Sequence, residues 1–143
     1  MVKATTVLAL VGIILYWAST ESLEKYVKKN DMVLVEFWGT WCPTCTEDLH
    51  KTFATARAYP KAKFLLIAVS DNEYDLRQFF RSKRITVPDN VLITTWRGAT
   101  PVKTIPRFWV YYKGKKILEA KSMDEVKKKL ITAFGHKLPK ELQ

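Results

Sequence analysis

The chain contains only two cysteines, and both lie in the sequence Trp41-Cys42-Pro43-Thr44-Cys45. An apolar run from Met32 to Trp38 precedes this motif, and a helical pattern without Gly or Pro follows it as far as Pro60. A strand, a tight turn, two cysteines separated by two residues and a helix form the context in which this spacing predicts a redox-active dithiol. The sequence therefore favours a redox site at the junction of a strand and a helix.

The two thiols are expected to differ in reactivity. Cys42 lies just before the helix, where unpaired backbone N–H groups and the positive end of the helix dipole favour a thiolate over a thiol. Cys45 lies one turn further along the helix, close enough to form a disulfide with Cys42 or to resolve a mixed disulfide. We therefore expect Cys42 to be the attacking thiol and Cys45 the resolving one.

Two other interpretations of the cysteine pair are weaker. A structural zinc site needs four ligands, and beyond the cysteines the chain offers only His50 and His136 as histidine ligands. A purely structural disulfide would close a very short loop, where the gain from chain entropy is smallest. No metal is therefore expected, and the redox interpretation is favoured.

Glu36 is a charged residue within the apolar run that precedes the cysteines. The run is typical of a strand buried on both faces of a sheet, where an ionised carboxylate is costly. Burial would raise the pKa of this carboxyl, which suits a group that exchanges protons near neutral pH. The alternative is a carboxylate that points into solvent at the end of the strand.

A second landmark lies downstream, in the run from Thr104 to Ile117. Pro106 opens a stretch rich in β-forming residues, and a strand tolerates proline at its first position because no N–H is needed there. Lys113-Gly114 then predicts a turn into a second strand, so the run is expected to form a hairpin.

With the Trp41–Cys45 motif and Thr104-Ile105-Pro106 in this order, the chain resembles the thioredoxin superfamily over roughly residues 20–135. The resemblance implies an α/β thioredoxin fold with a central mixed β-sheet flanked by helices. It also implies a cis peptide bond between Ile105 and Pro106 beside the dithiol, and pairing of the Ile105 backbone with the substrate as an added strand. Glu36 matches the family's buried acid, which helps to remove the proton from Cys45.

The resemblance further implies a thiol-disulfide oxidoreductase that reduces disulfides of protein substrates. Its expected substrate-binding residues are Trp41, Ile105, Pro106 and Arg107, and the expected structural residues of the motif are Pro43 and Thr44. No glycine-rich phosphate loop of a nicotinamide or flavin enzyme is present, so no cofactor beyond the Cys42–Cys45 disulfide is expected. The electron donor is then another protein.

The remaining elements follow from periodicity. One helix is expected to begin at Thr20, as N-cap, and to end at residue 30, and a second is expected to run from the dithiol to about residue 59. Two further helices are expected over residues 72–81, with Asp71 as a candidate cap, and over residues 123–134, with Ser122 as cap. Further strands are expected at residues 63–70 and 115–120, and a short strand or an extended insert is expected at residues 91–96. The domain is expected to span residues 20–136, followed by a tail at 137–143.

Residues 1–19 form a positive start followed by an apolar block without charge, the pattern of a signal anchor or a signal peptide. We expect an N-terminal hydrophobic helix that remains as an anchor, with the domain on the extracytoplasmic side of a membrane. A first strand or helix of the domain itself, and a cytoplasmic protein, are the alternatives. The net charge of +10 favours acidic partners or anionic lipids, and no nucleic-acid motif is visible.

The length between the central strand and Pro106 is similar to that of the membrane-anchored TlpA, ResA and DsbE-like reducing proteins, whereas Glu36 and the Thr104–Ile117 run resemble ordinary thioredoxin. A monomer is expected. The alternatives are a thiol oxidase or isomerase, since the reduction potential sets the direction, a cytosolic thioredoxin, and a non-catalytic, membrane-tethered interaction module.

Overall fold

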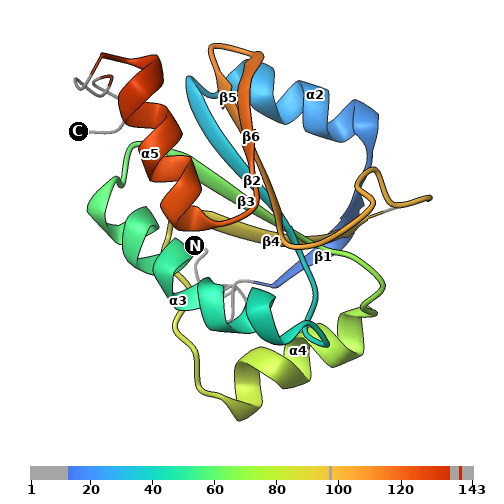
Figure 1. The fold of residues 1–143 in the computed structure, drawn as a ribbon. Coiled ribbons are helices and arrows are strands. Elements are labelled where there is room, and N and C mark those ends of the chain that lie inside the picture. The colour runs from blue at the N-terminus through green and yellow to red at the C-terminus, as the bar shows by residue number, and fades with distance from the viewer. Residues whose placement is uncertain (1–12, 97, 136–138, 140–143) are drawn as a thin grey trace.

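The computed structural model describes residues 13–96, 98–135 and 139 (Figure 1). Its centre is a mixed six-stranded sheet with the strand order β1-β4-β3-β2-β5-β6. The strands are β1 (Ile13–Ala18), β2 (Met32–Trp38), β3 (Lys63–Ala68), β4 (Val91–Trp96), β5 (Arg107–Tyr112) and β6 (Lys115–Ala120). The helices are α2 (Thr20–Lys29), α3 (Pro43–Ala58), α4 (Glu73–Ser82) and α5 (Met123–Ala133).

Strand β2 lies in the interior of the sheet, and both of its faces are covered. All seven of its residues are buried, and it pairs in parallel with β3 and antiparallel with β5. Helix α2 covers one face of the sheet, whereas α3, α4 and α5 cover the other (Figure 1). The alternation of side chains along a strand sends Val33, Val35 and Phe37 toward α2, and it sends Leu34 and Trp38 toward the other three helices.

The expected N-terminal hydrophobic helix is wrong for residues 13–18. These residues form strand β1, which pairs in parallel with β4 at the edge of the sheet. The segment is rich in β-branched and aromatic residues, which favour strands, and β4 supplies partners for its backbone groups. Residues 1–12 lie outside the described part of the chain, so the signal anchor stays a prediction. No helix within the described ranges is long and apolar enough to cross a membrane.

The helix boundaries differ from expectation at two caps. Ser19, not Thr20, caps α2, and it forms a capping box with Ser22. Asn72, not Asp71, caps α4, where its side chain accepts a hydrogen bond from the Asp75 N–H at 2.7 Å. Both differences arise because several polar residues adjoin each helix start, and any of them can serve as a cap. The expected cap of α5, Ser122, is confirmed, and the tail at 137–143 lies almost wholly outside the described residues.

Candidate active site

The two cysteines form a disulfide at the start of α3. Cys42 is the N-cap, and Pro43 takes the first helical position, where its missing N–H costs nothing. The Cys42 sulfur accepts a hydrogen bond from the Cys45 N–H at 3.2 Å. Cys45 is fully buried, whereas 6% of Cys42 is exposed, so Cys42 is the more accessible of the two residues. The Thr44 hydroxyl lies 3.5 Å from the same sulfur.

The loop between β2 and the disulfide forms hydrogen bonds with the residues that follow β3. The backbone N–H of Thr40 donates to the Asp71 carboxylate at 2.9 Å, and the Thr40 hydroxyl donates to its other oxygen. The Trp41 indole N–H donates to the Val69 carbonyl at 3.1 Å. A Cβ on Gly39 would lie 2.7 Å from this indole nitrogen, so the close approach requires glycine. Trp41 is thereby held across the loop with 58% of its surface exposed.

The bond between Ile105 and Pro106 is cis, as the resemblance implied. Ile105 and Cys42 lie on one shallow groove of about 450 Å³, and among the described residues that line it only Lys103 is charged. The groove is lined by Trp41, Cys42, Pro43, Val69, Ser70, Thr100, Val102, Lys103, Thr104 and Ile105. The structure therefore brings four of the expected site residues, Trp41, Cys42, Pro43 and Ile105, together on one surface.

Arg107 lies apart from this groove. It is the first residue of β5, paired with Phe37, and it lines a separate hollow with Glu119, Glu125 and Lys129. Its expected contact with substrate stays a prediction, and so does that of Pro106, which precedes it.

Glu36 is fully buried on the face of β2 that α3 covers, so the solvent-exposed alternative is wrong. Its Oε1 accepts a hydrogen bond from the Thr52 hydroxyl at 2.8 Å, and its Oε2 has no partner among the described residues. Burial raises the pKa of this carboxyl from 4.5 to about 8; the hydrogen bond from Thr52 opposes the rise, and the charge of Asp48 adds to it. The raised pKa confirms the expectation from sequence.

The strands beside Glu36 supply no cation that would offset its burial. Its register partners are Leu66 on β3 and Phe108 on β5, and both are fully buried. Glu36 therefore binds a proton at neutral pH and can release it slightly above neutrality, beneath the same helix that carries the disulfide. Among the described residues, no three His, Cys, Asp or Glu side chains are grouped to hold a metal ion.

Sequence reasoning misses three residues of this site. The sequence suggests Asp71 as a helix cap, and it marks Thr52 and Asp48 only as ordinary helix positions. Asp71 lies 31 positions from Thr40, and Thr52 lies 16 positions from Glu36. The sequence does offer one signal for Thr52. It is a polar residue on the inward face of α3, and a buried hydroxyl requires a hydrogen-bond partner.

Residues 15–79, somewhat less than half of the chain, match the family model Thioredoxin. No curated protein matches the chain significantly. Solved structures with similar folds include a thioredoxin-family thiol:disulfide interchange protein from Chlorobium tepidum, with 19% identity, a TM-score of 0.56, and coverage of 78% of this chain and 85% of the other. The N-terminal domain of PilB from Neisseria gonorrhoeae has 19% identity, a TM-score of 0.58, and coverage of 81% and 83%.

An exposed lipoprotein thioredoxin from Streptococcus pneumoniae is similar at 17% identity with a TM-score of 0.58, over 74% of this chain and 87% of the other. At these identities the likeness concerns the fold. The family match adds the sequence of the dithiol motif, and the structure adds the disulfide at the start of α3 and the cis bond at Pro106. The chain therefore has the fold of these thioredoxin-family structures, and residues 15–79 match the Thioredoxin family model.

Proposed function

We propose that the protein is a thiol-disulfide oxidoreductase that reduces disulfides of protein substrates. The observation that carries the proposal is the Cys42–Cys45 disulfide at the start of α3, with Cys42 on the groove and the buried acid Glu36 on the strand beneath the helix. The similar protein from Chlorobium tepidum is described as a thiol:disulfide interchange protein, which supports the same class of reaction.

The reaction begins with the reduced protein. The Cys42 thiolate attacks one sulfur of the substrate disulfide, so a mixed disulfide forms and the other substrate sulfur leaves as a thiolate that takes up a proton. The helix N-terminus favours the thiolate form of Cys42. Cys42 is suited to the attack because this residue, unlike Cys45, is partly exposed and lines the groove.

The second step releases the substrate. Glu36, in its carboxylate form, accepts the proton of the Cys45 thiol as that sulfur attacks Cys42. The Cys42–Cys45 bond forms, the mixed disulfide breaks, and the second substrate sulfur leaves and is protonated. The substrate gains two electrons and two protons, and the dithiol loses them. Because the pKa of Glu36 is about 8, its carboxylate fraction, and with it this step, increases as the pH rises from 7 to 8.

The substrate is proposed to bind as an extended segment along the groove. The Ile105 backbone is proposed to pair with it as an added strand, and the exposed Trp41 offers an apolar surface on the same groove. Pro106 and Arg107 are proposed to contact the segment beyond Ile105. Another protein is proposed to return electrons to the oxidised dithiol.

The cellular location of the protein is part of the same proposal. The apolar residues that precede Ile13, together with the charge of +10, support attachment to a membrane with the domain on its extracytoplasmic side. A cytoplasmic thioredoxin is the alternative. We propose a monomer in either case.

A redox titration of the full chain tests the function. The fraction of Cys42–Cys45 disulfide is measured against buffers of known potential, and reduction of insulin is followed with dithiothreitol as donor; Cys42→Ser is the inactive control. A potential near that of thioredoxin, about −270 mV, supports the reductase, whereas a value near −120 mV indicates an oxidase. A bridge that resists reduction would contradict both and indicate a non-catalytic module.

A further inference from the structure

Two side chains of α3, one helical turn apart, act on the buried carboxyl of Glu36. Thr52 is fully buried, and its hydroxyl donates to Glu36 Oε1 at 2.8 Å while the Asp48 carbonyl lies 3.5 Å from the same hydroxyl. A hydrogen bond to a carboxylate favours its charged form, whereas a nearby negative charge opposes that form. Thr52 and Asp48 therefore act on Glu36 in opposite directions.

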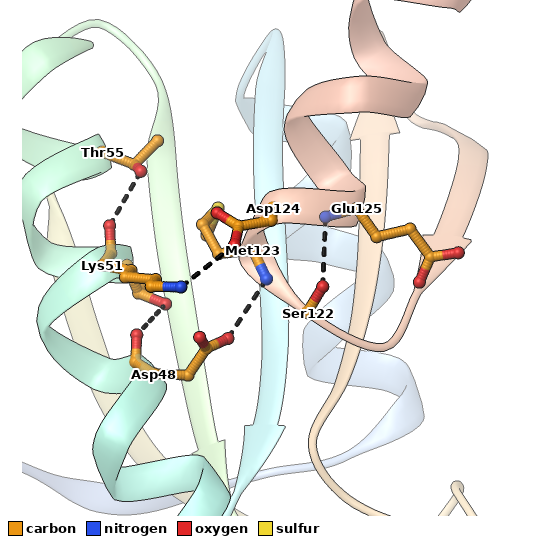
Figure 2. Close-up of polar contacts among 8 residues, drawn as sticks. Asp48, Lys51, Thr55, Ser122, Met123, Asp124 and Glu125 are labelled. Carbon is orange, nitrogen blue, oxygen red and sulfur yellow. Dashed lines mark hydrogen bonds and ion pairs between the residues drawn. The ribbon is translucent and has the colours of Figure 1, made fainter.

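The charge of Asp48 is held in place by the start of α5. The Met123 N–H, in the first turn of α5, donates to Asp48 Oδ2 at 3.1 Å. Figure 2 shows this contact between α3 and α5, with the Asp48 side chain directed to the backbone of the facing helix. The hydrogen bond to the helix N-terminus holds this half-buried carboxylate in position.

Other charged groups near this junction are exposed. Lys51 and Asp124 form an exposed ion pair across the same two helices at 3.0 Å (Figure 2). Glu47 and His50 on α3 are exposed as well. The strands on either side of Glu36 present Leu66 and Phe108, which carry no charge. Asp48 is half-buried, and its charge adds to the rise of the Glu36 pKa.

We propose that Thr52 and Asp48 are positioning residues that together set how tightly Glu36 holds its proton, with Thr52 favouring the carboxylate and Asp48 opposing it. For the reaction, the inference rests on the proposed function, in which the Glu36 carboxylate takes the proton of Cys45. The pair thereby sets the fraction of carboxylate that is available at neutral pH.

Two near-isosteric substitutions separate the effect of Thr52 on Glu36 from the effect of Asp48. Thr52→Val removes the hydroxyl but keeps the branched shape, so it raises the pKa of Glu36 and slows disulfide reduction at pH 7. Asp48→Asn removes the charge but keeps an oxygen for the Met123 N–H, so it lowers the pKa of Glu36 and speeds the reaction. At a pH well below the pKa, the carboxylate fraction falls about tenfold when the pKa rises by one.

Two matched variants serve as controls. Thr52→Ser restores the hydroxyl and is expected to return the titration of Glu36 toward that of the parent. Asp124→Asn removes one negative charge from the same α3–α5 junction but from an exposed ion pair, and it is expected to leave the titration and the rate unchanged. A merely structural role of Thr52 or Asp48 would move stability without moving the titration in opposite directions.

The test uses the full chain with ¹³C-labelled glutamate. The carboxyl signal of Glu36, identified by its loss in Glu36→Gln, is titrated by NMR in each variant, and the rate of insulin reduction is measured over the same pH range. Opposite shifts of the titration support the proposal; equal, same-sign or absent shifts overturn it. Opposite shifts without a matching change in the rate support the positioning of Glu36 and instead overturn its part in the proposed function.

Discussion

Glu36 is the residue at which stability and the proposed proton transfer oppose each other. Its burial makes the charged form costly, which raises its pKa to about 8 and prepares it to exchange a proton near neutral pH. The same burial means that folding favours the protonated acid. Stability that depends on this residue is therefore fully present below the unfolded pKa of about 4.5 and is lost as the pH rises through the folded value of about 8.

Glu36→Gln is expected to remove this pH dependence. Between pH about 5 and 8.5 the parent should lose stability on the order of several kcal/mol, since a pKa that differs by one between the folded and unfolded states corresponds to about 1.4 kcal/mol. The glutamine variant should lose much less, and it should reduce disulfides more slowly. Urea unfolding at several pH values measures the first effect and insulin reduction the second. Parallel stability curves for parent and variant would contradict the assignment.

Cys42 is expected to react first with an alkylating agent in the reduced protein. It is the N-cap of α3 and retains 6% exposure, whereas Cys45 is fully buried. The measurement is mass spectrometry of the reduced chain after brief treatment with iodoacetamide at several pH values. Preferential labelling of Cys45 would overturn the assignment of attacking and resolving thiols.

The residues of the site differ in how far the sequence reveals them. Cys42, Cys45 and Glu36 are evident because a dithiol motif and a charge within an apolar run are local signals. Asp71 and Thr52 are not evident, because their partners are brought near only by the fold. Residue type alone does not tell whether an aspartate after a strand will cap a helix or bind a distant loop.

At the scale of elements, the loop after β2 depends on the turn after β3. Asp71 accepts two hydrogen bonds from Thr40, and Val69 accepts one from the Trp41 indole. The turn includes Ser70 with φ of 63°, in the left-handed region. These contacts fix the position of the disulfide relative to the end of β3, so the geometry of the groove depends on a segment outside the motif.

Asp71→Ala is expected to loosen this loop. The loss of both hydrogen bonds to Thr40 should lower the free energy of unfolding by about 1–3 kcal/mol and slow disulfide reduction, because Trp41 and Cys42 lose their support. Thermal unfolding and insulin reduction measure the two effects. Asp89→Ala, at an exposed aspartate elsewhere in the chain, is the matched control and should change neither quantity. Equal stability and equal rates of insulin reduction in the two variants would show that the loop keeps its conformation without the Asp71 hydrogen bonds.

Elements with local signals are well predicted from the sequence, and those that depend on distant pairing are not. Strand β2, helix α3 and the β5–β6 hairpin lie close to the expected residues. Strand β1 takes the place of an expected helix, because an apolar segment has the same composition whether it enters a membrane or joins a sheet. Its partner, β4, lies more than 70 residues away in the sequence, and no local pattern indicates that pairing.

At the scale of the whole molecule, β1 completes the sheet on one edge. It covers β4, which otherwise would expose a row of unpaired N–H and C=O groups. The dithiol, the groove and Glu36 all lie on residues after Thr20. We therefore expect β1 to contribute to the stability and solubility of the fold more than to the reduction of disulfides.

Two truncations are expected to behave differently. A chain that begins at Ile13 keeps β1 and should retain the stability of the described fold. A chain that begins at Thr20 exposes the edge of β4, so it should unfold at lower urea concentration and associate more readily, while its folded fraction still reduces insulin. Urea unfolding and size-exclusion chromatography compare them. Identical unfolding midpoints would mean that β1 adds nothing to the domain.

The disulfide at the start of α3 uses both cysteines of the chain, and there is no third thiol in the sequence. Each molecule can therefore store only one pair of electrons, and it cannot pass a mixed disulfide to a further cysteine of its own. Mixed with excess substrate and no donor, a reduced sample should release two substrate thiols per molecule and then stop. In the proposed function each molecule thus carries one pair of electrons per cycle, and its turnover is limited by the rate at which the donor reduces the disulfide again.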